Sequence, residues 1–264
     1  MTALITGASS GFGVAIARIF TQNNHKVIIL ARRKERLDSL QKELGSLAQS
    51  IVCDVCDTQS IAKALSHLPK DFKNIDVLIN NAGLALGLSS ADKASIADWE
   101  RMVEVNVIAL MKLTHLLLPQ MVAQGHGHII NIGSIAGSYP YPGGNVYGAT
   151  KAFVKQFSLN LRADLYDKNI RVSDIEPGLC GGSEFSYVRF KGDEKKAQSV
   201  YEGTTPLMPE DVAQSVFWVA SLPQHININR LELMPTTQAP AALNVYKKAK
   251  FNKFNPLSYN VILI

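Results

Sequence analysis

Short apolar runs rich in β-branched residues alternate along the chain with longer segments in which apolar residues recur every three or four positions. Runs of roughly four to eight apolar residues are typical of strands buried on both faces, whereas the longer spacing is typical of amphipathic helices. The pattern predicts strands at 3–6, 26–31, 50–54, 76–80, 128–133, 171–175 and 228–234. It predicts helices at 14–22, 34–44, 61–67, 99–121, 147–166 and 210–222.

The alternation of strands and helices predicts one fold class. Right-handed crossover helices between parallel strands cover both faces of the sheet. We therefore expect a single α/β domain of the Rossmann type, with a doubly wound parallel sheet of about seven strands. This domain is expected to span residues 1–245 and to include a mobile substrate loop at 178–206, because long irregular loops in compact domains often act as lids. Residues 246–264 are expected to form a tail whose role the sequence leaves open.

Composition narrows the class of protein. The chain has 264 residues, of which 47% are hydrophobic and 19% charged, as in a compact globular enzyme. The net charge of +5 includes four lysines of the tail, and no segment interleaves basic and aromatic residues as single-strand platforms do. We therefore expect no nucleic-acid partner.

Cellular location is predicted from what the sequence lacks. The N-terminus has no cationic region before a long apolar stretch, and the apolar segment 109–121 is interrupted by polar residues and a proline. Three cysteines are too few for a disulfide framework. We expect a cytoplasmic protein with no membrane partner.

A glycine-rich turn follows the first predicted strand and opens directly into a helix. It reads Thr6-Gly7-Ala8-Ser9-Ser10-Gly11-Phe12-Gly13. Turns in general use glycine, but at a strand-to-helix junction glycines also let a pyrophosphate approach the backbone N–H groups of the helix N-terminus. We therefore expect Gly7, Ala8, Ser9, Ser10, Gly11 and Phe12 to bind a dinucleotide.

The end of the second predicted strand indicates which dinucleotide. An NAD site places an acidic residue there, whereas this chain has Arg32 and Arg33. Guanidinium groups suit the 2′-phosphate of NADP, although solvated surface arginines would produce the same sequence. We expect NADP as the cofactor, with Asp54 and Val55 beside its adenine. Cys53 and Cys56 have C-x-x-C spacing, but with no second pair they do not make a four-ligand zinc site, so we expect no metal.

Tyr147 and Lys151 lie four positions apart in a predicted helix, which places both on one face. A neighbouring ammonium lowers the pKa of a phenol by stabilising the phenolate, as proton transfer at neutral pH requires. A surface pair of no function has the same spacing. Three features outside the pair favour the catalytic interpretation: Ser134 after the fifth strand, Asn81-Ala82-Gly83 after the fourth, and Asn106 within the next helix.

With these motifs in order, and Pro177-Gly178 after the sixth strand, the chain resembles the short-chain dehydrogenase/reductase superfamily. The resemblance implies that Tyr147 is the general acid/base and that Lys151 binds the nicotinamide ribose and lowers the Tyr147 pKa. It implies that Ser134 orients the substrate carbonyl and that Asn106 supports a water-linked proton relay. The further cofactor contacts that it implies are Asn81, Ala82, Gly83, Pro177, Gly178, Leu179, Cys180 and Ser183, with Cys180 a packing residue rather than a nucleophile.

Three segments carry a closer resemblance: GSIAGSYP at 133–140, GGNVYGATKAF at 143–153 and EPGLCGGSEFS at 176–186. They are similar to the bacterial NADP-dependent 3-hydroxy acid dehydrogenases, a group that includes serine and L-allo-threonine dehydrogenases and malonic semialdehyde reductases. This resemblance spans about residues 1–245 and implies a homotetramer assembled through long helices.

The substrate carboxylate of a 3-hydroxy acid calls for a nearby cation, and the loop offers Arg189 and Lys191. We expect Arg189 to bind it, beside Ser134 and Tyr147, although basic loop residues are ordinarily solvated. Serine, L-allo-threonine, 3-hydroxyisobutyrate and 3-hydroxypropionate are not ranked by the sequence. Two alternatives stay open: a reductase of a bulkier apolar ketone, and a non-catalytic sensor of NADP.

Overall fold

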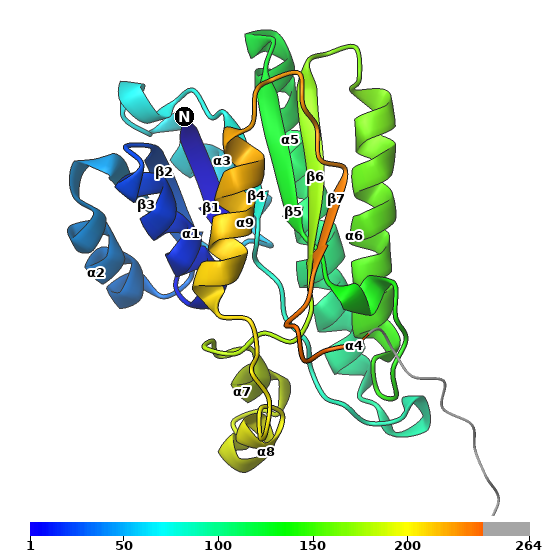
Figure 1. The fold of residues 1–264 in the computed structure, drawn as a ribbon. Helices are drawn as coiled ribbons and strands as arrows, with labels where there is room; N and C mark the ends of the chain where they lie inside the picture. The colour runs from blue at the N-terminus through cyan, green and yellow to red at the C-terminus, as the bar shows by residue number, and fades with distance from the viewer. Residues whose placement is uncertain (240–264) are drawn as a thin grey trace, which may run out of the picture.

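The computed structural model describes residues 1–239 and forms one parallel sheet of seven strands (Figure 1). The strands are β1 (Thr2–Thr6), β2 (Lys26–Ala31), β3 (Ala48–Val52), β4 (Val77–Asn80), β5 (Gly127–Ile132), β6 (Ile170–Pro177) and β7 (Arg230–Leu233). Their order is β3-β2-β1-β4-β5-β6-β7 and every pairing is parallel. This confirms the predicted single α/β domain of the Rossmann type.

Helices cover both faces of the sheet (Figure 1). On one face, α1 (Gly11–Gln22), α2 (Lys34–Leu44) and α9 (Pro209–Ser221) pack over a core that includes Ile16, Phe20 and Val216. On the other, α3 (Thr58–Ser66), α5 (Leu110–Gln124) and α6 (Asn145–Asp164) contribute to a second core. In β1 and β2, alternate residues enter opposite cores, which explains why these strands are apolar throughout.

The strand order reverses between β1 and β4, because the chain moves outward from β1 to β3 and then crosses to the other side. Ligands of open α/β sheets bind at the carboxyl ends of strands beside such a switch point. The glycine-rich turn after β1, Asn81 after β4 and Ser134 after β5 all lie at this edge. The topology therefore gathers the candidate residues before any side-chain contact is considered.

Several predicted boundaries are wrong. The third strand covers 48–52 rather than 50–54, so Asp54 lies two residues beyond its end. Asp57 caps α3 by accepting a hydrogen bond from the Ser60 N–H at 3.0 Å, and the helix starts three residues earlier than predicted. The last strand is limited to four residues. Propensity leaves such ends open because capping contacts decide them.

The segment predicted as an irregular loop at 178–206 contains two short helices, α7 (Phe185–Arg189) and α8 (Glu194–Ser199). Figure 1 shows them below the carboxyl edge of the sheet, apart from the other helices. Asp193 caps α8 through the Lys196 N–H at 3.1 Å. The predicted tail at 246–264, and the end of the domain at 245, lie outside the described residues.

The helix predicted over 99–121 runs from α4 (Ile96–Val103) through a π-helical segment, Glu104–Ala109, into α5. Within residues 1–239, this continuous helix of 29 residues is long and apolar enough to cross a membrane by length and composition. The sequence pattern did not predict a helix of this length and apolar character, because polar residues and a proline interrupt the apolar run at 109–121. Since Leu113, Leu117 and Met121 of this helix pack into the second core, it serves here as a core helix.

Candidate active site

The glycine-rich turn after β1 packs too closely for side chains at two of its glycines. A Cβ at Gly13 would lie 2.5 Å from the Gly7 carbonyl oxygen, and a Cβ at Gly7, whose φ is +67°, would lie 3.0 Å from Ala82 Cα. Ser10 precedes α1 without capping it through its side chain. The N–H groups of the first helical turn are therefore available to an anion, as a dinucleotide pyrophosphate requires.

Asn81 and Thr6 tie the ends of β4 and β1 together. The Asn81 side-chain amide donates to the Thr6 carbonyl at 2.8 Å, and the Thr6 hydroxyl accepts from the N–H groups of Asn81 and Ala82 at 3.0 and 2.9 Å. This bridges the switch point and holds the glycine turn in place. The predicted trio Asn81, Ala82 and Gly83 thus lies beside the phosphate turn, as a cofactor site requires.

The two arginines after β2 have different surroundings. Arg32 is 66% exposed and its guanidinium lies 3.7 Å from Asp54. Arg33 donates from Nε and Nη2 to the Ser9 hydroxyl at 3.1 and 3.0 Å, and from Nη1 to Glu184 at 2.7 Å. Because the fork of Arg33 is already engaged, Arg32 is the guanidinium with more freedom to receive a 2′-phosphate.

Asp54 accepts a hydrogen bond from the Cys56 N–H at 2.9 Å and lies 3.4 Å from the Arg101 guanidinium. Val55 is half-buried beside the second core. Burial raises the pKa of Cys56 to about 11, so this thiol stays protonated at neutral pH. Residues 1–239 contain no cluster of three metal-ligating side chains.

Tyr147 and Lys151 project from α6 and are both buried, with 8% and 7% exposure. The Lys151 ammonium lies 6.0 Å from the Tyr147 ring centroid and donates to the Ile132 carbonyl at 2.7 Å. Burial raises the pKa of Tyr147 to about 12, opposed mainly by a hydrogen bond with Ser134. The expected lowering of this pKa by Lys151 is therefore wrong for the protein without cofactor, because burial outweighs any effect of the ammonium.

The pKa of Lys151 is shifted in the opposite direction, downward. Burial lowers its pKa to about 8, and the neighbouring Asp174 partly offsets this. Asp174 is fully buried in β6, and a Cβ at Gly133 would lie 2.3 Å from its carboxylate. Because Gly133 directly precedes Ser134, the absence of a side chain there lets the Asp174 carboxyl group lie close to Ser134.

Asn106 lies in the π-helical segment and is 2% exposed. Its side chain accepts from the Leu84 N–H at 2.9 Å and donates to the Leu84 carbonyl at 2.8 Å and to Thr150 at 3.1 Å. π-helical turns often mark functional sites. This one places Asn106 between the segment after β4 and α6, near Lys151, since a Cβ at Gly83 would lie within 3.6 Å of both side chains.

The segment after β6 lies beside the glycine-rich turn. The side-chain oxygen of Gln238 accepts from the Leu179 N–H at 2.7 Å and lies where a Cβ at Gly178 would be. Pro177 ends β6, and Ser183 lies against Gly11, 2.9 Å from a Cβ built there. Burial raises the pKa of Cys180 to about 12, which agrees with the packing role expected for that thiol.

Arg189 is the loop cation that reaches the catalytic residues. Its guanidinium lies 5.8 Å from the Tyr147 ring centroid and 5.5 Å from that of Tyr141, and it donates to the Tyr141 hydroxyl at 2.7 Å. Lys191 instead pairs with Asp98 of α4 at 2.8 Å. Of the two cations considered from sequence, only Arg189 is placed to contact a substrate carboxylate.

Sequence reasoning missed four residues of the site: Arg36, Tyr141, Glu184 and Gln238. Arg36 carries a signal that could have found it, since it lies three positions after Arg33 and shares a helix face with it. The other three lie in connecting segments and reach the site through contacts distant in sequence. No local pattern marks them.

A profile of the short chain dehydrogenases matches residues 1–190. The chain belongs to this family. Among its relatives, the NADP-dependent 3-hydroxy acid dehydrogenase YdfG of Escherichia coli (strain K12) is 56% identical, covering 94% of this chain and 100% of the relative. Serine 3-dehydrogenase of Agrobacterium fabrum (strain C58 / ATCC 33970) is 49% identical, covering 94% and 99%.

A solved structure of a closed serine dehydrogenase complexed with NADP+ superposes with a TM-score of 0.93. It is 56% identical and covers 94% of this chain and 100% of its own. Serine dehydrogenase from Escherichia coli, in a second structure, gives a TM-score of 0.80 at 51% identity, covering 90% and 100%. This short-chain dehydrogenase thus has the fold and the family that the motifs predict.

Arg32→Ala is expected to weaken NADPH binding by roughly 10- to 100-fold, the range for a charge-assisted hydrogen bond to phosphate. NADH lacks the 2′-phosphate, so its affinity should stay within about twofold. Fluorescence titration of both cofactors measures the change. Lys34→Ala, which removes a neighbouring exposed cation, serves as the control. An equal loss for NADH and NADPH would assign Arg32 a structural role instead.

Proposed function

We propose that this dehydrogenase transfers a hydride between NADP and small 3-hydroxy acids. The observation that carries the proposal is the position of Arg189, whose guanidinium lies 5.8 Å from the ring of the buried Tyr147. A substrate hydroxyl bound to Tyr147 would place a carboxylate a few bonds away within reach of this cation. The names of the relatives support the same substrate class.

The nicotinamide of NADP accepts or donates the hydride. The residues of the chain hold the substrate and move its proton. Tyr147 exchanges the proton of the substrate hydroxyl, and Ser134, whose hydroxyl acts to lower the pKa of Tyr147, orients the same oxygen. With a pKa of about 12, Tyr147 is protonated at neutral pH and is ready to donate when a carbonyl is reduced.

Lys151 and Asn106 support the proton path behind Tyr147. Lys151 is held by the Ile132 carbonyl and is positioned for a ribose hydroxyl. Asn106 is held by the N–H and the carbonyl of Leu84 and donates to Thr150, and so fixes the polar groups on this side of α6. Semialdehyde reduction is the reverse of hydroxy acid oxidation and uses the same residues.

Arg189→Ala is the test of the substrate class. We expect KM for 3-hydroxy acids to rise by roughly 10- to 100-fold, because a charge-assisted hydrogen bond is lost. KM for the methyl esters of the same acids, which carry no charge, should change little. Steady-state kinetics with both series measures the split. Lys195→Ala, an exposed change in the same loop, is the control.

An unchanged KM for the acids in Arg189→Ala would remove the proposed carboxylate site. The same panel should include apolar ketones, because a bulkier apolar substrate is the competing assignment. An Arg189 cation within the cleft favours the charged substrate. A sensor without turnover is disfavoured because Ser134, Tyr147 and Lys151 are all present in one buried site.

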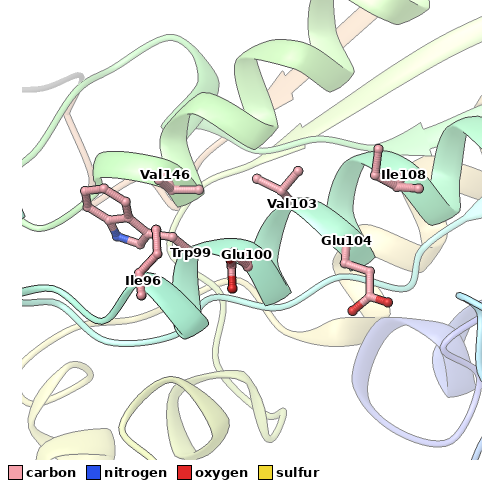
Figure 2. A pocket seen from close by; sticks show the side chains of 7 residues that line it. All are labelled: Ile96, Trp99, Glu100, Val103, Glu104, Ile108 and Val146. Carbon is pink, nitrogen blue, oxygen red and sulfur yellow. The ribbon is translucent and has the colours of Figure 1, made fainter.

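We also propose that the protein acts as a homotetramer in the cytoplasm. The long helix exposes an apolar stripe that includes Ile96, Val103 and Met111. Beside it lies an apolar groove of about 420 Å³, lined by Ile96, Trp99, Glu100, Val103, Glu104, Ile108 and Val146 (Figure 2). Contiguous exposed apolar surface of this kind marks association sites. Sedimentation velocity should give four chains per particle, and a monomer would contradict the proposal.

A further inference from the structure

Helix α7 carries a charged residue at each end, and the two charges face different parts of the cleft. Glu184 immediately precedes the helix and reaches the arginines after β2. Arg189 is its last residue and lies over Tyr147. A helix rises about 1.5 Å per residue, so Glu184 and Arg189 are separated by roughly 8 Å along the axis of α7.

The Glu184 carboxylate bridges two guanidinium groups. One oxygen accepts from Arg33 at 2.7 Å and the other from Arg36 at 2.8 Å. The hydrogen bond from Arg36, reinforced by Arg33, holds the pKa of Glu184 below its usual value despite partial burial. The group is therefore an anion at neutral pH, and each of its oxygens has a cationic donor.

Arg33 connects this bridge to the phosphate turn, because it also donates to the hydroxyl of Ser9. The residue before Glu184 reinforces the contact, since Ser183 packs directly against Gly11. The start of the substrate loop thus lies on the two segments that form the cofactor site, the phosphate turn and the arginine cluster.

Charge balance allows the bridge to persist when a 2′-phosphate is bound. Arg32, Arg33 and Arg36 carry three positive charges and Glu184 one negative, which leaves two positive charges (3 − 1 = 2). A phosphate monoester carries about −1.5 to −2 at pH 7. Asp54, near Arg32, also lies 3.4 Å from Arg101, which it shares with Glu104.

We propose that Glu184 is a positioning residue: by bridging Arg33 and Arg36 it latches α7 to the cofactor side of the cleft and so holds Arg189 over Tyr147. The proposal rests on the assigned role of Arg189 in substrate binding. Two residues after α7, the Lys191–Asp98 ion pair holds the loop against α4. Arg189 is also tied to Gly87, whose N–H donates to the Arg189 carbonyl at 2.9 Å and whose carbonyl accepts from Arg189 Nε at 3.2 Å. Breaking the Glu184 bridge leaves these contacts but releases the start of α7 from the arginines, so the loop opens more often and Arg189 spends less time over Tyr147.

Limited trypsin digestion of the full-length protein without cofactor or substrate tests the latch directly. The variant is Glu184→Gln and the matched control is Glu194→Gln, an exposed carboxylate of the same loop. We expect cleavage after Arg189, Lys195 and Lys196, followed by mass spectrometry, to be roughly three- to tenfold faster in Glu184→Gln. Glu184→Asp, which keeps the charge, should restore part of the protection. Equal rates in the two glutamine variants would overturn the proposal.

Kinetics at saturating NADPH distinguish positioning from a general loss of structure. Glu184→Gln should raise KM for the carboxylate substrate by about the same three- to tenfold, with kcat within about twofold. Arg36→Gln removes one of the two donors to Glu184, so it should have a smaller effect in the wild type and little further effect in Glu184→Gln, where both contacts are already weakened. Additive effects would overturn the latch.

The experiments distinguish a failure of the carboxylate site at Arg189 from a failure of the latch at Glu184. If Arg189→Ala leaves KM for the acids unchanged while Glu184→Gln still accelerates cleavage, the latch is supported and the carboxylate site is lost. If Arg189→Ala raises KM and Glu184→Gln leaves cleavage unchanged, the substrate class is supported and the latch is overturned. Digestion of the protein without cofactor makes this distinction independent of activity.

Discussion

Tyr147→Phe is expected to lower kcat by roughly 10²- to 10⁴-fold in both directions, the usual contribution of a positioned general acid or base. Phenylalanine keeps the ring that packs edge-on against Phe185 at 5.8 Å, so the fold and the cleft should be unchanged. Only the proton-exchanging hydroxyl is removed. The dissociation constant of NADPH, measured by fluorescence titration, should stay within about threefold.

The pH dependence of the Tyr147→Phe variant provides a second readout. Burial raises the pKa of Tyr147 to about 12, so the phenolate needed for oxidation becomes more abundant as pH rises toward that value. The oxidation rate of the wild type should therefore rise with pH above neutrality, and the residual rate of the variant should lack this rise. Tyr166→Phe, at a tyrosine with 73% exposure, is the matched control. A variant that keeps wild-type turnover would overturn the assignment of Tyr147.

Lys151→Met is expected to lower kcat by about a hundredfold or more and, at the same time, to stabilise the protein. Burial lowers the pKa of Lys151 from 10.5 to about 8, and 2.5 units at 1.36 kcal/mol each correspond to about 3 kcal/mol against folding. Methionine removes this cost but leaves the Ile132 carbonyl without its donor, which costs about 1–3 kcal/mol. The net gain of roughly 1 kcal/mol raises Tm by about 2–4 °C at pH 7.

The stability difference between Lys151→Met and the wild type should itself depend on pH. Between pH 8 and 10.5 the unfolded chain binds more protons than the folded one, so the wild type gains stability as pH rises through this window. Below pH 8 the full cost of the buried cation is present. Calorimetry at pH 7 and at pH 10 should therefore find the advantage of the variant only at the lower pH. A variant that is less stable than the wild type at pH 7 would contradict the burial argument.

The elements and the chemistry of the site were predictable where they depend on local spacing. The alternation of apolar runs and amphipathic segments identified all seven strands, because burial on both faces of a parallel sheet makes its central strands largely apolar. The glycines at the start of α1 are recognisable in the sequence, because the backbone there leaves no space for a Cβ. Element ends were less predictable, as the shifted third strand illustrates, because contacts such as the Asp57 cap decide them.

Tyr147 and Lys151 show the limit of local reasoning within the catalytic pair itself. Their spacing along α6 correctly placed both side chains in one buried site. The predicted direction of the Tyr147 pKa shift was wrong. The shift depends on how completely the surrounding segments exclude water from the phenol. The π-helical segment around Asn106 was likewise invisible, since its side chain is fixed by Leu84 and Thr150.

By itself, the sequence determined the sheet and the phosphate turn, since each follows from periodicity or from spacing within one segment. The proton-transfer roles of Ser134, Tyr147 and Lys151 rest on the family resemblance and stay predictions. Only the tertiary structure decided which loop cation enters the cleft, placing Arg189 at Tyr147 and Lys191 at Asp98. It also joined Glu184 to Arg33 across 151 positions of sequence. Such contacts depend on how distant segments pack, and they form only after the sheet has brought those segments together.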